Sequence, residues 1–160
     1  RISADPDVNV PIIAHPAFTG SLYPSPHHGL SASLLLGKLM RLSGADIVLF
    51  PSPYGSVAMP KEDALELTNL LQSPDSIHRP AFPTPSAGIH PGLVPKMIQD
   101  FGNNIIINAG GGIHGHPQGT LAGGKAFMDA IQATISGQTL AQAADNSAEL
   151  RSAIDKWGAL

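Results

Sequence analysis

Short apolar runs alternate along the chain with longer stretches in which apolar residues recur every three or four positions. This alternation predicts strands separated by helices, which is typical of βα units with a parallel sheet. The pattern predicts four strands, at residues 8–14, 46–50, 82–85 and 105–109. It predicts five helices, at residues 29–43, 61–72, 90–101, 122–136 and 146–157. We therefore expect an α/β fold.

The predicted helices carry recognisable end signals. Pro60 precedes the second helix, and the early Glu62 and Asp63 favour its N-terminal dipole. Asn146 or Ser147 is expected to cap the last helix. Two helices have an apolar face that we expect to point inward, and each is followed by a glycine. These faces are Leu30, Leu34, Leu35, Leu39 and Leu42 before Gly44, and Val94, Met97, Ile98 and Phe101 before Gly102.

The ends of the predicted strands recur at a regular spacing. They fall at His15, Phe50, Ser86 and Gly110, which are 35, 36 and 24 residues apart. This is the spacing of a (β/α)8 repeat, and four units make half of a barrel of about 250 residues. Because a glycine-rich strand with its helix is typically last, we expect residues 1–160 to be a partial C-terminal barrel domain. The N-terminal domain and the first half of the barrel would then precede Arg1.

The apolar run at residues 105–109 ends in a glycine cluster, Gly110, Gly111 and Gly112. Glycines lack the Cβ atoms that hold an anion away from backbone amides, and the helix predicted from residue 122 is expected to direct its N-terminal dipole to the same point. A related turn at residues 86–88 ends the preceding strand. Together the two strand ends predict one shared pocket for a phosphate ester.

Two other interpretations of the glycines stay open. Gly110, Gly112 and Gly115 match the dinucleotide pattern G-x-G-x-x-G. Against it, Pro117 interrupts the exit of the motif, and Asp129 falls inside a predicted helix instead of ending a second strand. A tight turn without any ligand would also explain the cluster.

Composition restricts the kind of partner. Apolar residues make up 42% of the chain, and the longest apolar runs are strand-sized, which fits a soluble protein without a membrane span. A net charge of −3 with nine Lys and Arg residues argues against nucleic acid. The absence of cysteine excludes disulfides and thiolate metal sites and is compatible with a cytoplasmic protein. A bound phosphate would therefore be held mainly by amides and dipoles.

Four motifs resemble, in order and spacing, the second half of the RuBisCO large-subunit barrel. They are residues 15–17 (HPA), 42–46 (LSGAD), 85–90 (PSAGIH) and 110–119 (GGGIHGHPQG). Residues 50–58 (FPSPYGSVA) and 155–158 (DKWG) further resemble the RuBisCO-like proteins of methionine salvage, the 2,3-diketo-5-methylthiopentyl-1-phosphate enolases. The resemblance covers nearly the whole chain. It implies strands five to eight, with their helices, of a RuBisCO-type (β/α)8 TIM barrel.

The resemblance also implies a reaction. The enolases convert 2,3-diketo-5-methylthiopentyl-1-phosphate to its 2-hydroxy-3-keto enol phosphate: a proton leaves the carbon beside a ketone, and Mg²⁺ steadies the enolate. Carboxylases carry a Gly-Lys pair in the loop after strand six, whereas this chain reads YGSVAM at residues 54–59, so carboxylation is not expected. A RuBisCO-like phosphate-binding protein of other or lost activity is the alternative, and a ribulose-bisphosphate carboxylase is a distant third.

Four residues match substrate-contacting positions of the family, and Ser86 is a fifth candidate. Gly110 and Gly111 match its phosphate site, and Gly88 matches a further substrate contact. Ser86 would add a hydroxyl group or, alternatively, cap a turn. His15 matches a substrate-contacting histidine, whose imidazole would donate to a carbonyl or enolate oxygen; the alternative is a structural histidine.

Other polar clusters have simpler explanations. His114 and His116 have no third ligand nearby in sequence, so we expect them to form hydrogen bonds within their loop. Residues 61–63 (KED) differ in order and place from the metal site of the family, a carbamylated lysine followed by two acids, and are expected to be a solvated helix end. The resemblance places the Mg²⁺ ligands and the base lysine upstream of this chain, which alone is expected to be inactive. It also implies a homodimer.

Overall fold

The computed structural model describes residues 2–25, 27–55, 57, 59–74 and 78–160. The chain folds into two compact units. Unit 1 comprises Arg1–Pro53, Val57–Ser86 and Asn104–Ile107. Unit 2 comprises Tyr54–Ser56, Ala87–Asn103 and Asn108–Leu160. In the loop at residues 54–59, Ser56 and Ala58 lie outside the described residues.

Unit 1 contains a three-stranded parallel sheet in the order β1-β2-β3. The strands are β1 (Ile13–Ala14), β2 (Ile47–Pro51) and β3 (Phe82–Ser86). In the ladder, Ala14 lies opposite Val48, and Pro51 lies opposite Ser86. Because the strands are parallel, their carboxyl ends meet at one edge of the sheet, where ligands bind in folds of this kind.

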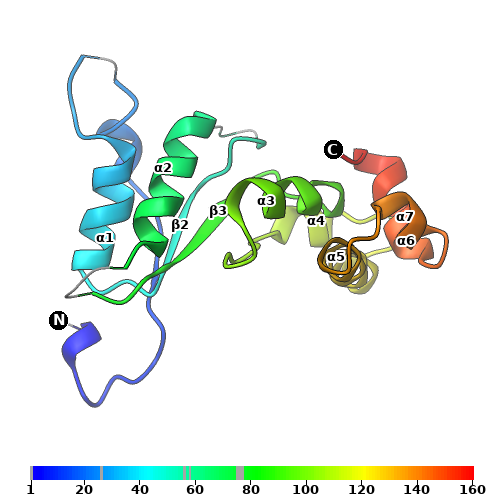
Figure 1. Ribbon diagram of the computed structural model, residues 1–160, viewed down its shortest axis with the longest axis horizontal. Coiled ribbons are helices and arrows are strands. Elements are labelled where there is room, and N and C mark those ends of the chain that lie inside the picture. The colour runs from blue at the N-terminus through cyan, green and yellow to red at the C-terminus, as the bar shows by residue number, and fades with distance from the viewer. Residues whose placement is uncertain (1, 26, 56, 58, 75–77) are drawn as a thin grey trace. The chain divides into compact units, whose positions relative to one another are not determined.

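The helices of unit 1 cover this sheet. As predicted, α2 (Lys61–Gln72) starts directly after Pro60. The earlier helix has two parts, the π-helical η3 (Ser33–Lys38) and α1 (Leu39–Leu42). α2 packs against both η3 and β3 (Figure 1). The described part of unit 1 also has two short 3₁₀ helices, η1 (Ile2–Ala4) and η2 (Thr19–Ser21).

The inward leucine face predicted for the first helix is wrong in part. Of that face Leu35 is buried and Leu34 is half-buried, whereas Leu30, which precedes the helix, and Leu39 and Leu42 are 41%, 37% and 49% exposed. Leu36, which was not on the predicted face, is buried instead. A π-helix places more residues in each turn than an α-helix does, because its hydrogen bonds span five residues. The turns of η3 therefore rotate the later side chains away from the positions that a regular α-helix predicts.

Two of the predicted strands differ from the structure. β1 is limited to Ile13 and Ala14, since the residues before them run past the start of β2 at Ile47. Residues 105–109 form no strand, although the amide of Ile106 donates to the carbonyl oxygen of Pro83 at 3.1 Å. The chain leaves unit 1 after residue 107, which ends this pairing before a ladder can form.

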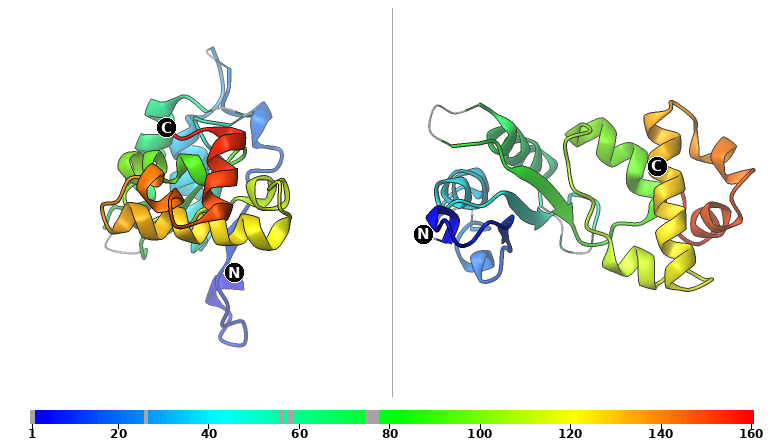
Figure 2. Two further views of the ribbon diagram at one scale, coloured as in Figure 1. Left: turned by 90° about the vertical axis from the view of Figure 1, so that its right-hand side faces the viewer. Right: turned by 90° about the horizontal axis from the view of Figure 1, so that it is seen from below.

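Unit 2 is helical and is built around α5, which packs against α3, α4, α6 and α7 (Figure 2). Its elements are η4 (Pro91–Leu93), α3 (Val94–Phe101), α4 (Gly110–His114), α5 (Thr120–Ile135), α6 (Leu140–Ala144) and α7 (Ala148–Trp157). Ala126, Ala130 and Ala133 lie on the buried face of α5. These small side chains allow the neighbouring helices to approach closely.

Several helix signals in unit 2 are confirmed. Of the four predicted inward residues, Val94, Met97 and Phe101 are buried in α3 and Ile98 is half-buried, and Gly102 ends that helix at φ 78°. Ser147 is the cap of α7, and its hydroxyl oxygen accepts from the amide of Leu150 at 3.1 Å. Two short helices, α4 and α6, were not predicted. None of the described helices has the length and apolar character that a membrane crossing requires.

Candidate phosphate-binding site

The glycine cluster forms the first turn of α4, so α4 and not α5 is the helix that begins at these glycines. This corrects the expectation that the next helix starts near residue 122. The first intrahelical bond of α4 runs from the amide of Ile113 to the carbonyl oxygen of Ala109 at 3.0 Å. The amides of Gly110, Gly111 and Gly112 precede it and have no intrahelical acceptor. Their N-cap, Ala109, provides no side-chain acceptor either.

The first two glycines of α4 are open to an approaching ligand. Gly110 and Gly111 are exposed, and a Cβ atom added at either position would meet no atom within 4 Å. A small anion can therefore approach these amides without a side chain in the way, and the helix dipole favours its negative charge. Accessible backbone amides at Gly110 and Gly111 are what the predicted phosphate site requires.

Gly112 has the opposite environment and fixes α4 in place. It is buried, and an added Cβ atom would overlap the carbonyl oxygen of Ile89 and lie 3.0 Å from Cζ of Phe127. Only glycine allows this close approach of α4 to the chain that follows Gly88. Unit 2 therefore brings the predicted residues Gly88, Gly110 and Gly111 to one region.

The turn at Ala87 and Gly88 has a left-handed backbone, with φ 72° at both residues. For a residue with a Cβ atom this conformation costs roughly 1–2 kcal/mol. Such residues persist only where their surroundings hold them, and they gather at ligand sites. The conformation of Ala87 thus supports the assignment of this turn to the site.

The other two predicted site residues, His15 and Ser86, belong to unit 1. His15 directly follows β1 and is exposed, and Ser86 is the last residue of β3 and is half-buried. Both lie at the carboxyl edge of the sheet, as predicted. Because β2 lies between their strands, two strand spacings of about 5 Å each separate the two backbones.

The histidines after α4 form hydrogen bonds, but one of these bonds leaves the loop, which corrects in part the expectation of bonds within it. His114 Nδ1 lies 3.2 Å from the hydroxyl oxygen of Thr120. His116 Nδ1 accepts from the amide of Gln118 at 3.1 Å, and its Nε2 lies 2.9 Å from the carbonyl oxygen of Glu149. With Nδ1 accepting, Nε2 is the nitrogen that donates to the carbonyl oxygen of Glu149, so both ring nitrogens of His116 are in use.

No group of three or more His, Asp or Glu residues comes together in the described part of the chain. The residues Lys61, Glu62 and Asp63 form the first turn of α2, in agreement with the predicted helix end. The donor set that Mg²⁺ prefers, several carboxylate oxygens around one point, does not occur among the described residues. No catalytic step is therefore assigned to a metal ion held by them.

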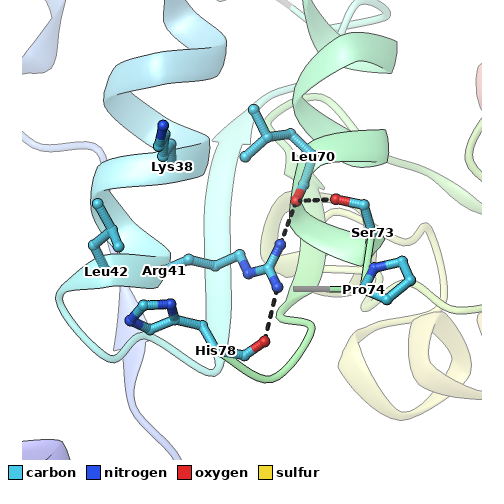
Figure 3. Close-up of a pocket in the computed structure, with 7 residues that line it drawn as sticks. All are labelled: Lys38, Arg41, Leu42, Leu70, Ser73, Pro74 and His78. Atoms are coloured by element: carbon cyan, nitrogen blue, oxygen red, sulfur yellow. Dashed lines mark hydrogen bonds between the residues drawn. The ribbon is translucent and has the colours of Figure 1, made fainter. Parts of the chain in front are cut away.

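Unit 1 contains a pocket of about 270 Å³ that is not lined by any of the predicted site residues (Figure 3). Inside it the guanidinium group of Arg41 donates to the carbonyl oxygens of Leu70, at 2.7 Å, and His78, at 3.0 Å. His78 precedes β3, whereas Ser86 ends it, so the pocket lies toward the amino ends of the strands. Arg41 is only 6% exposed and joins α1 to the last turn of α2 and to the connection between α2 and β3, a structural role that the sequence pattern did not indicate.

Comparisons with known proteins identify the family. Residues 5–157 match the family described as ribulose bisphosphate carboxylase large chain, catalytic domain. A protein of Geobacillus thermodenitrificans named 2,3-diketo-5-methylthiopentyl-1-phosphate enolase is 55% identical over 156 residues, which are 98% of this chain and 38% of that protein. A protein of the same name from Geobacillus kaustophilus is 56% identical over 154 residues, 96% of this chain and 37% of that protein.

Solved structures agree with this assignment. The crystal structure of a RuBisCO-like protein (MtnW) from Alicyclobacillus acidocaldarius is 54% identical with a TM-score of 0.93, covering 98% of this chain and 39% of that one. The octameric RuBisCO of Pyrococcus horikoshii is 38% identical with a TM-score of 0.89, covering 95% of this chain and 36% of that one.

The chain belongs to the family of RuBisCO large-chain catalytic domains. Within it, the chain is similar to the enolases of methionine salvage, and it spans about 38% of the length of the first of them. The predicted fold class is confirmed: the chain has the fold of the C-terminal half of a RuBisCO-type barrel.

Proposed function

We propose that the complete polypeptide is a 2,3-diketo-5-methylthiopentyl-1-phosphate enolase and that this chain supplies its phosphate site. The observation that carries the proposal is the open, uncapped start of α4 at Gly110 and Gly111, fixed beside the turn at Gly88. The relatives with this name at about 55% identity support the choice of substrate. In this proposal the substrate phosphate accepts hydrogen bonds from the amides of Gly110 and Gly111.

The roles of the remaining site residues follow from their chemistry. Gly88 provides a further backbone contact, and the hydroxyl of Ser86 donates to the substrate. The imidazole of His15 donates to the oxygen on which negative charge develops as the enolate forms. Mg²⁺, when bound, would stabilise that charge, and its ligands, like the base lysine, are proposed to lie on parts of the polypeptide outside these 160 residues.

We further propose that the complete protein is a homodimer. A related RuBisCO from Hyperthermus butylicus, 31% identical with a TM-score of 0.84, is described as dimeric, and the one from Pyrococcus horikoshii as octameric. Light scattering of the purified complete protein would measure the mass of the assembly. A monomer would contradict this part of the proposal.

The proposed activity is tested with the complete polypeptide and the diketone phosphate. Enolisation changes the ultraviolet absorbance, so turnover can be followed directly, with and without added Mg²⁺. We expect enolisation by the complete protein and none by residues 1–160 alone. Binding of the substrate without enolisation would favour the alternative, a RuBisCO-like phosphate-binding protein of other or lost activity. Fixation of CO2 on ribulose bisphosphate would contradict the assignment.

A further inference from the structure

The loop that follows β2 is attached to α3 through Tyr54. The Tyr54 hydroxyl donates to Oδ2 of Asp100, and its ring lies edge-on to Phe101 with the ring centroids 6.2 Å apart. Asp100 is in turn paired with Lys96, whose Nζ lies 3.0 Å from Oδ1, and its side chain is only 8% exposed. All four residues belong to unit 2, so one turn of α3 holds the tyrosine.

The Tyr54 hydroxyl keeps its proton over a wide range of pH. Burial, followed by the hydrogen bond to Asp100 and the negative charge of that carboxylate, raises the pKa of Tyr54 above its ordinary value of 10.0. The phenol is therefore protonated and able to donate at every pH used in ordinary enzyme assays. Lys96 balances the charge of the buried carboxylate, which stabilises the ionised acceptor.

The residue after Tyr54 contacts the proposed phosphate site directly. A Cβ atom added at Gly55 would overlap the carbonyl oxygen of Ala87, lie 2.7 Å from its carbonyl carbon and lie 3.3 Å from the amide nitrogen of Gly88. The backbone of the loop is thus in van der Waals contact with the peptide group between Ala87 and Gly88. That peptide group follows the left-handed Ala87, which requires support from its surroundings.

We propose that Tyr54 is a positioning residue: bound to Asp100, it holds Gly55 against the peptide group of Ala87 and so orients the Gly88 amide toward the substrate phosphate. The affinity for phosphate then depends on a hydroxyl group that is not itself in contact with the ligand. The orientation of Gly88 is independent of the proposed function, whereas the effect on phosphate affinity rests on it.

The first test uses the complete polypeptide and inorganic phosphate as the probe. Tyr54→Phe removes the donor and keeps the ring, and Tyr23→Phe is the matched control at the other tyrosine of the chain. We expect the Kd for phosphate, measured by calorimetry, to rise about tenfold in Tyr54→Phe. A loss of this size is no larger than the free energy that a hydrogen bond to a charged group contributes. The control should bind as the parent protein does. In the enolisation assay we expect KM to rise by a similar factor and kcat to change less.

A structural role alone would give a different result. If Tyr54→Phe lowered the melting temperature while the Kd for phosphate and the KM stayed at the parent values, the proposal would be overturned. Asp100→Asn provides a second variant, since its amide oxygen still accepts from the phenol. It should retain more affinity than Tyr54→Phe, and the double variant should be no weaker than Tyr54→Phe alone. Additive losses would contradict the coupling of the two residues.

A second measurement separates this inference from the proposed function. In protein labelled with ¹⁵N-glycine, the Gly88 amide signal should shift in Tyr54→Phe and stay in place in Tyr23→Phe, with or without phosphate. If the parent protein bound no phosphate, the phosphate site would be wrong, yet this shift would still support the positioning of Gly88. An unchanged Gly88 signal in Tyr54→Phe would overturn the inference.

Discussion

The imidazole ring of His90 stacks on the indole ring of Trp157, with the ring centroids 5.9 Å apart and the planes inclined by 20°. This contact joins the chain that follows Gly88 to the end of α7. Two other polar side chains surround the indole: Lys156 Nζ lies 4.9 Å from its centroid, and the His116 ring lies 6.3 Å away. Burial lowers the pKa of His90 from the ordinary value of 6.5.

Because the pKa of His90 is lower in the folded chain, the free energy of unfolding should depend on pH. In the unfolded chain His90 takes up a proton as the pH falls through about 6.5, whereas in the folded chain it does so only at lower pH. The unfolded state then binds more protons, so this residue lowers stability on acidification below about 6.5 and has no such effect above about 7.5. Melting temperatures of the complete protein between pH 7.5 and 5.5 should fall more steeply for the parent than for His90→Gln. The exposed His27→Gln is the control, and equal slopes for parent and His90→Gln would contradict the prediction.

Gly112→Ala should destabilise the protein and weaken phosphate binding together. The added methyl group would overlap the carbonyl oxygen of Ile89 and push α4 away from the turn at Gly88. Overpacking of this kind costs about 1–3 kcal/mol. Gly124→Ala is the matched control, because a Cβ atom added at this position of α5 would meet no neighbouring atom within 4 Å. It should stabilise the protein by about 0.5–1 kcal/mol. Chemical denaturation and phosphate titration measure the two effects, and a Gly112→Ala variant as stable as the parent would show that the contact is not tight.

Gly111→Asp should abolish substrate binding without preventing folding. The side chain has room, since a Cβ atom at Gly111 would meet no atom within 4 Å. Its carboxylate would lie at the same amides as the substrate phosphate, where the two negative charges repel each other. The same substitution at Gly124 adds the charge elsewhere and should leave KM unchanged. Steady-state kinetics of the complete enzyme would decide: an unaltered KM and turnover in Gly111→Asp would remove the phosphate site from α4.

His15→Ala should lower kcat more than it raises KM. A donor that meets charge only as the enolate forms is worth about 10²–10³-fold in rate. His28→Ala, at an exposed histidine that is hydrogen-bonded to Ser25, serves as the control and should leave turnover intact. A His15→Ala variant that changed only the melting temperature would favour a structural role for this residue.

Elements whose signals are local can be predicted from the order of the amino acids. The bounds of α2 follow from Pro60 and the acidic first turn, and α3 ends at Gly102 because a positive φ is easiest for glycine. The helix signals depend on residues close together in the chain. The glycine cluster indicated the proposed phosphate site, and the repeat of strand ends every 24 to 36 residues indicated the half-barrel.

Contacts between segments that are distant in the chain could be seen only in the folded structure. Tyr54 and Asp100 are 46 residues apart, and no local pattern distinguishes this tyrosine from a surface residue. The assignment of the glycines to α4 depends on the packing of Gly112 against Ile89, since a helix of five residues has too little intrinsic stability to be predicted. The burial of Leu36 in place of Leu39 depends on the π-helical turns of η3, which a regular period of 3.6 residues does not anticipate. Local propensity therefore predicts where the segments lie in the chain, whereas close packing between them determines which side chains are buried and which backbone amides are left open to a ligand.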